Sequence, residues 1–286
     1  MNDSRPALRA VFLDIGDTVM RPNPSWEHVY AMAFEEFGVD VDISELHTAL
    51  RAAYHHGGWG MEGGFEPTEE TSFQRTVAID AAAIAELGLQ PMPDAFYRRL
   101  SELFMVTSHW HIFPDAYPAL EGLRERDLIV GAVSNWVWNL PELLHALDLV
   151  RGFDFIAASA RIGFEKPHPR IFEWALARAQ VEPSSVIHVG DHIGADVEGA
   201  RGVGIDGVLI DRSSRYAAEE IPAGVPVIHV GDHVDADVLG ARGVGIEGIL
   251  IDRNERYAAD QVPDGVAVIR SLEELLPIVD ARLPDR

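Results

Sequence analysis

The sequence contains no cysteine. This absence excludes disulfide bonds, thiolate catalysis and zinc sites with cysteine ligands, and it favours a cytoplasmic location. There is also no run of about 18 or more apolar residues, so we expect no transmembrane helix. The N-terminal residues lack the apolar core of a signal peptide. We therefore expect a globular protein rather than a membrane protein or a disulfide-stabilised secreted one.

Positive charge is scarce. The chain has 23 basic residues against 46 acidic ones, which gives a formal net charge of −23. Such a surface repels nucleic acids and anionic membranes, so we expect neither as a partner. It also repels anionic substrates, so a phosphate site in this chain needs local positive charge. Lys166 is the only lysine, and every other basic residue is arginine. A single compact ammonium group points to a role that a guanidinium does not fill.

Two parts of the sequence have the residue pattern of an α/β fold. Residues 9–14 form an apolar run that ends in an acid, which is typical of a buried parallel strand. From about residue 112 onward, apolar runs alternate with helical patterns, so we expect a doubly wound parallel sheet, a Rossmann-like fold. Ligands bind such sheets at the carboxyl ends of the strands. The later predicted strands cover 128–133, 153–158 and 185–190, and the predicted helices cover 115–126, 140–149 and 170–180.

The segment between these parts has a different pattern. Four stretches carry apolar residues at helical spacing, beginning near Trp26, Ile43, Phe73 and Phe96, with no strand pattern between them. This pattern predicts a small all-helical bundle.

The predicted domains follow from these patterns. We predict a core domain that comprises residues 1–20 and 110–286, interrupted by a helical cap domain at 21–109. Within the cap, residues 54–67 are too rich in glycine for a helix, so we expect a loop there. His55, His56 and Trp59 of this loop are candidate substrate contacts.

One segment of the sequence occurs twice in succession. Residues 187–227 and 228–268 are identical at 29 of 41 positions, and both begin with IHVGDH. Each copy has the pattern of one βαβ unit. Two copies are too few for a solenoid, so we interpret them as a tandem duplication.

Polar residues follow four of the predicted strands in an order that suggests phosphoryl transfer. Asp14 would be the nucleophile and would form an aspartyl phosphate. Ser134, Asn135 and Lys166 would bind the phosphate group. Asp14 and Asp191 would hold Mg²⁺, which prefers few carboxylates together with water and substrate phosphate.

The motifs around these residues resemble those of the haloacid dehalogenase-like (HAD) hydrolase superfamily, in the group with a helical cap after the first motif. VFLDIGDT, AVSN, GFEKPHPRIF and HVGDHIGADVEGAR resemble its four motifs in order. The resemblance implies a Mg²⁺-dependent phosphohydrolase that acts on a small phosphorylated metabolite. It also implies metal ligation by Asp196 and by the main-chain carbonyl of Gly16, and a cap that selects the substrate.

The first motif departs from the pattern of the phosphatases of this family. These usually carry a second aspartate, the general acid, two residues after the nucleophile. Gly16 stands there, and the next acid is Asp17. Asp17 either replaces the missing acid or only caps the turn. We therefore expect a preference for good leaving groups, such as acyl or aryl phosphates, which need little protonation.

The same departure keeps two other functions open. Haloacid dehalogenases of this superfamily lack the second aspartate as well, but they also lack the acidic GD pair of the fourth motif, which this chain carries twice. A non-catalytic descendant that binds phosphate or a protein partner is the other alternative.

Either repeat copy offers the acids of the fourth motif. From Lys166 to Asp191 there are 25 residues, enough for one helix and one strand, whereas Asp232 is 66 residues away. We expect the first copy to complete the site and the second to extend the sheet beyond it. The opposite arrangement stays open, because both copies keep both carboxylates.

Overall fold

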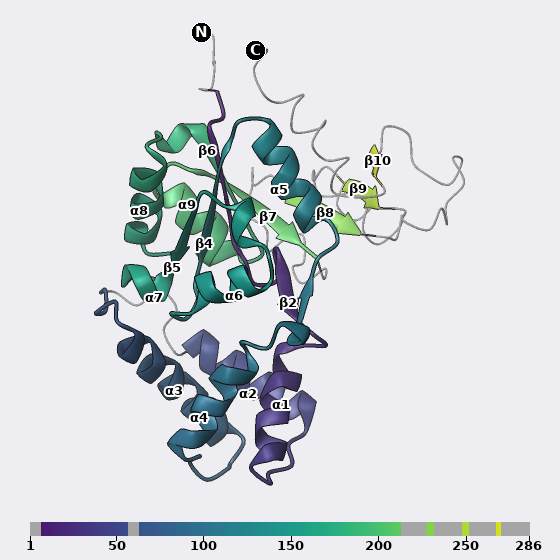
Figure 1. The fold of residues 1–286 in the computed structure, drawn as a ribbon, viewed down its shortest axis with the longest axis vertical. Helices are drawn as coiled ribbons and strands as arrows, with labels where there is room; N and C mark the ends of the chain where they lie inside the picture. The colour runs from purple at the N-terminus through teal and green to yellow at the C-terminus, as the bar shows by residue number, and fades with distance from the viewer. Residues whose placement is uncertain (1–6, 57–62, 213–226, 232–247, 252–266, 270–286) are drawn as a thin grey trace.

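The computed structural model describes residues 7–56 and 63–212, together with three strands further along the chain. Eight of the described strands form one sheet in the order β10-β9-β8-β7-β6-β1-β4-β5, in which adjacent strands are parallel (Figure 1). The predicted parallel α/β fold is therefore confirmed. The strands are β1 (Ala10–Leu13), β4 (Ile129–Ser134), β5 (Phe155–Ala158), β6 (Val186–Gly190), β7 (Asp206–Asp211), β8 (Val227–Gly231), β9 (Gly248–Ile251) and β10 (Ala267–Ile269).

Helices cover both faces of the sheet around β1. Val11 packs in one hydrophobic cluster with Leu120 and Leu143, whereas its neighbour Phe12 packs in another with Phe172. This alternation is why the strand is apolar throughout, since both faces are buried. The helical segments are α5 (Ala116–Glu125), α6 (Leu140–Ala146), α7 (Ser159–Ile162), α8 (Pro169–Ala179), α9 (Gly199–Gly202), the π-helical η4 (Ile193–Glu198) and the 3₁₀ turns η1 (Thr107–His109), η2 (Val150–Gly152) and η3 (Pro183–Ser185).

Four helices form a separate group at one end of the described molecule (Figure 1). Their apolar faces meet in a hydrophobic cluster of their own, so the predicted bundle of four helices is present. The predicted loop 54–67 is wrong at its start, because α2 continues to His56. Its histidines precede the glycines, so the helix ends later than the glycine content suggested. The helices are α1 (Trp26–Glu36), α2 (Ile43–His56), α3 (Glu69–Glu86) and α4 (Asp94–Leu103).

The two chain segments that join the helical group to the sheet pair with each other. β2 (Met20–Pro22) and β3 (Trp110–Ile112) form a two-stranded antiparallel ribbon. The sequence analysis did not predict these strands, because three residues are too few to show an alternating pattern. The ribbon brings the start and the end of the helical segment together.

The two repeat copies occupy different places in the sheet. β6 and β7 belong to the first copy, and β6 pairs directly with β1. β8 and β9 belong to the second copy and extend the sheet beyond β7, as predicted. β8 is separated from β1 by two strands, about 14 Å at the usual strand spacing. Asp232 lies outside the described residues.

The described part of the chain contains no helix that is both long and apolar enough to cross a membrane.

Candidate active site

Five of the predicted site residues meet at the carboxyl ends of β1, β4 and β6, namely Asp14, Ser134, Lys166, Asp191 and Asp196. β1 lies between the other two strands, so the residues that follow all three face one crevice. The main-chain N–H of Asp14 donates to the carbonyl of Val189 at 2.8 Å, which continues the pairing of β1 and β6 past the end of β1. Asp14 and Ser134 are both buried. The sheet thereby fixes a carboxylate and a hydroxyl side by side below the surface.

Lys166 joins two of the acids. Its ammonium Nζ lies 2.6 Å from Oδ1 of Asp14 and 2.5 Å from Oδ1 of Asp196. The side chain is only 2% exposed, which is rare for lysine and requires charged partners. The only lysine of the sequence is thus the bridge between the first and fourth motifs.

The acids and the ammonium shift one another's pKa values. Burial raises the pKa of Asp14, and the nearby Asp196 adds to this, whereas the Lys166 ammonium and a hydrogen bond from Ser134 oppose it. Burial would also raise the pKa of Asp196, but Lys166 and His188 hold it below its usual value. Burial would lower the pKa of Lys166, yet the two carboxylates raise it. Lys166 is therefore an ammonium, and Asp196 is a carboxylate.

The main chain around Asp196 is shaped to receive its carboxylate. Oδ2 accepts the main-chain N–H of His192 at 3.0 Å, and Oδ1 lies 2.9 Å from Nε2 of His188. The carboxyl group lies over the α-carbon of Gly190, where any side chain would collide with it. This close approach explains the glycine of the HVGD motif.

Asn135 is engaged with the main chain of Lys166. Its Oδ1 accepts the N–H of Lys166 at 2.6 Å, and its Nδ2 donates to the carbonyl of the same residue at 2.9 Å. The amide therefore fixes the loop that carries the ammonium. Phosphate binding by Asn135, which the sequence predicted, stays a prediction.

Three carboxylates can converge on a cation. Oxygen atoms of Asp14, Asp191 and Asp196 all lie within 4.8 Å of one another. Hard carboxylate oxygens are suitable ligands for a divalent cation such as Mg²⁺. The residues present therefore fit the group that the sequence predicted, and ligation by Asp191 and the Gly16 carbonyl stays a prediction.

Two aromatic rings lie near the position of the missing second aspartate. A Cβ atom on Gly16 would lie 3.4 Å from the ring of Trp136 and 3.6 Å from that of Trp26. These two indoles and Trp110 form a cluster with ring centroids 5.5–5.9 Å apart. Asp17 has a left-handed backbone, with φ of 53°, and its Oδ2 accepts the indole N–H of Trp26 at 3.2 Å. The acid one place later is thus held by the first helix of the helical group.

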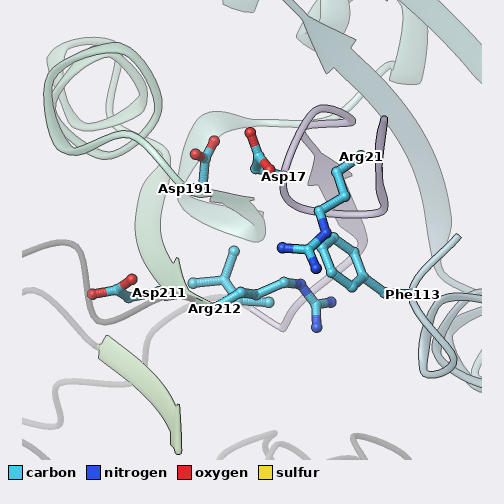
Figure 2. Close-up of a pocket in the computed structure, with 7 residues that line it drawn as sticks. Asp17, Arg21, Phe113, Asp191, Asp211 and Arg212 are labelled. Carbon is cyan, nitrogen blue, oxygen red and sulfur yellow. The ribbon is translucent and has the colours of Figure 1, made fainter. Parts of the chain in front are cut away.

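Asp17 also lines a small pocket of about 20 Å³, and Figure 2 shows Asp17 and Asp191 together on one side of it. Arg212 lies on another side, where it pairs with Asp115 at 2.9 Å and stacks on the ring of Phe113. Asp191 belongs to both the pocket and the carboxylate cluster, so the pocket adjoins the candidate cation site.

The predicted contacts of the helical group cannot be placed in the same way. His55 and His56 lie in the last turn of α2, and the described side chains do not include theirs. Trp59 lies outside the described residues.

Sequence reasoning missed His188, Trp26 and Trp136 as parts of the site. A histidine inside an otherwise apolar strand was the only signal for the first.

Comparison with known proteins identifies the family. A family model for haloacid dehalogenase-like hydrolases matches residues 8–204, a range that includes Asp14, Ser134, Lys166, Asp191 and Asp196. The haloacid dehalogenase-like hydrolase domain-containing protein 3 of Bos taurus is 32% identical over 218 residues, which cover 72% of this chain and 83% of that protein.

Two further proteins show how widely the likeness extends. The glyceraldehyde 3-phosphate phosphatase of Methanopyrus kandleri is 28% identical over 220 residues, which cover 72% of this chain and 84% of that one. The crystal structure of a HAD phosphatase from Thermococcus onnurineus superposes with a TM-score of 0.54 at 20% identity, and the match covers 95% of this chain and 98% of that chain. The second likeness concerns the fold alone. On the family match and the identity to its relatives, the chain belongs to the haloacid dehalogenase-like hydrolase family.

Proposed function

We propose that the chain is a Mg²⁺-dependent phosphohydrolase that acts on a small phosphorylated metabolite through an aspartyl phosphate at Asp14. The observation that carries this proposal is the buried bridge of Lys166 between Asp14 and Asp196. An ammonium group at this position offsets the negative charge of the acids around the nucleophile. It also offsets the negative charge of an incoming phosphate group. Relatives named as phosphatases support the reaction class.

Each residue has a separate task in the proposed reaction. The Asp14 oxygen that does not contact Lys166 attacks phosphorus, and the bond from phosphorus to the leaving oxygen breaks. Ser134 and Lys166 hold the phosphate oxygens during this step. Water then hydrolyses the acyl phosphate, which releases inorganic phosphate and restores the carboxylate. A bound Mg²⁺ would offset the repulsion between the carboxylate and the phosphate, with Asp14, Asp191 and Asp196 as its ligands.

The surroundings of Gly16 support a preference for good leaving groups. Phosphatases of this family usually carry their proton donor at the position of Gly16. Here the rings of Trp136 and Trp26 lie next to that position. A leaving group that departs as a stable anion, such as a phenolate or a carboxylate, needs no donor. We therefore propose aryl or acyl phosphates as the substrate class. Equal kcat/KM values for alkyl and aryl phosphates would contradict this.

The first repeat copy is the one that we assign to the site. β6 pairs with β1, and Asp196 of the same copy contacts Lys166. The family match also ends at residue 204, before the second copy begins. The second copy then serves as an extension of the sheet.

A panel of phosphate esters, assayed with Mg²⁺ and with EDTA, tests reaction class and metal together. We expect phosphate release with Mg²⁺ and its loss both in EDTA and in Asp14→Asn. The exposed Asp40→Asn is the matched control and should retain full activity. Halide release from 2-haloacids without metal would instead support dehalogenation. Phosphate binding without turnover would support the non-catalytic alternative.

A further inference from the structure

A buried histidine that the proposed reaction does not use lies directly beneath the acid cluster. His188 is on β6, two residues before Gly190, and its side chain has no exposed surface. Its Nε2 is 2.9 Å from Oδ1 of Asp196, and its ring meets that of Phe172 edge to face at 5.3 Å.

The direction of this hydrogen bond follows from the charge of its partner. Asp196 is a carboxylate and can only accept, so Nε2 of His188 carries the hydrogen and donates. The other ring nitrogen, Nδ1, has no hydrogen-bond partner within the described part of the chain. A buried polar atom without a partner destabilises a fold, and an apolar side chain at 188 would avoid that loss. Packing alone therefore does not account for a histidine here.

We propose that His188 is a positioning residue that orients the Asp196 carboxylate toward the cation site. His188 and Lys166 both donate to Oδ1, and the N–H of His192 donates to Oδ2. Donors on both oxygens fix the plane of the carboxylate. One lone pair of Oδ2 then remains for a cation shared with Asp14 and Asp191. Such outer partners of a metal ligand typically change metal affinity by about 10- to 100-fold.

The Mg²⁺ consequence rests on the proposed function, whereas the orientation of Asp196 does not. Two variants and one control separate the roles. His188→Leu removes the donor and the unpaired Nδ1, His188→Gln keeps an N–H that reaches Asp196, and Phe172→Leu disturbs the same packing without touching the acid.

Titration of the metal-free proteins with Mg²⁺, followed by calorimetry and by the shift of the unfolding midpoint, gives the first readout. We expect the Mg²⁺ dissociation constant to rise about 10- to 100-fold in His188→Leu. It should stay within a few-fold of the unsubstituted value in His188→Gln and in Phe172→Leu. The Mg²⁺ concentration for half-maximal activity should rise in parallel in His188→Leu, while kcat at saturating Mg²⁺ changes little. An unchanged dissociation constant in His188→Leu, with the same loss of stability as in Phe172→Leu, would show a packing role only.

A crystal structure of metal-free His188→Leu gives a readout that needs no metal binding. We expect the Asp196 carboxylate to rotate away from its position over Gly190. A carboxylate that keeps its orientation would overturn the proposal, even if the protein proved not to bind Mg²⁺. Failure of Mg²⁺ binding in the unsubstituted protein would instead count against the proposed function.

Discussion

Two buried carboxylates in this molecule have opposite properties. Asp196, at the strand tips, is 1% exposed, and Asp80, on α3 among the helices, is 2% exposed. Asp196 contacts an ammonium group, and its pKa lies below the usual value. Asp80 accepts hydrogen bonds from the hydroxyl groups of Tyr30 at 2.7 Å and Tyr54 at 3.4 Å, and burial raises its pKa to about 7.

The difference shows that burial does not by itself decide whether an acid is charged. Burial opposes the charged form in both places, and two phenols compensate for it only in part at Asp80. An ammonium reverses the balance at Asp196. Asp196 therefore keeps the negative charge that a cation site needs, whereas Asp80 serves as a hydrogen-bonding group in the bundle.

Removal of the Lys166 ammonium should have the largest effect on activity and stability, because it is what distinguishes Asp196 from Asp80. Lys166→Met would make the strand-tip cluster resemble the helical one, with buried acids and no cation. We expect kcat to fall on the order of 10³-fold, because the phosphate loses a charged partner. We also expect a loss of about 3–5 kcal/mol in the free energy of unfolding, because two buried carboxylates lose their ion pair. Phosphatase assays and urea unfolding measure the two effects.

A double variant is the control for this prediction. Asp14→Asn in the Lys166→Met background removes one of the unpaired carboxylates and should restore part of the stability. A free energy of unfolding that changes by less than about 1 kcal/mol in Lys166→Met would contradict the importance of the bridge.

The raised pKa of Asp80 should make the free energy of unfolding depend on pH. The pKa of Asp80 is about 7 in the folded protein against an ordinary value of 3.8, so the folded state binds more protons between these pH values. Stability from this group is therefore present below about pH 4 and falls as the pH rises to about 7. The total decrease is roughly 4 kcal/mol as an upper estimate, and stability then levels off.

Asp80→Asn keeps the acceptor oxygen without the charge. The contribution of the asparagine to stability should not change between about pH 4 and about pH 8. The variant should therefore be more stable than the unsubstituted protein at pH 8. Urea unfolding at several pH values measures this. Parallel stability curves for the two proteins from pH 4 to pH 8 would contradict the raised pKa.

Asp17 should give the smallest effect, because it is half-buried and its partner is a neutral indole. We expect Asp17→Asn to change kcat/KM for aryl phosphates by less than about 3-fold, since a phenolate leaves without protonation. A loss of about 100-fold or more that is confined to alkyl phosphates would identify Asp17 as the proton donor after all.

The sequence was most informative where a pattern was long or its chemistry was specific. β1 and β4 are apolar runs, the four helices of the bundle have apolar residues at regular spacing, and Lys166 stood out as the only lysine. The ribbon of β2 and β3 was too short to show a pattern. The continuation of α2 to His56 was obscured by the glycines that follow it.

Contacts between distant residues were beyond the reach of the sequence. The indole of Trp26 meets Asp17 because α1 packs against the loop after β1, and His188 meets Asp196 because a π-helical turn folds back over the end of β6. Neither contact has a sequence spacing that predicts it. The distance along the chain from Lys166 favoured the first repeat copy, and the sheet order agrees with this expectation, because β6 of that copy lies beside β1.

Separate substitution of the corresponding acids in the two repeat copies tests the central assignment most directly. Asp191→Asn should lower kcat/KM by at least about 100-fold and weaken Mg²⁺ binding, because that acid lies within the carboxylate cluster beside Lys166. Asp232→Asn should leave both quantities within about 2-fold of the unsubstituted values. Loss of activity in Asp232→Asn alone, with Asp191→Asn fully active, would contradict the account.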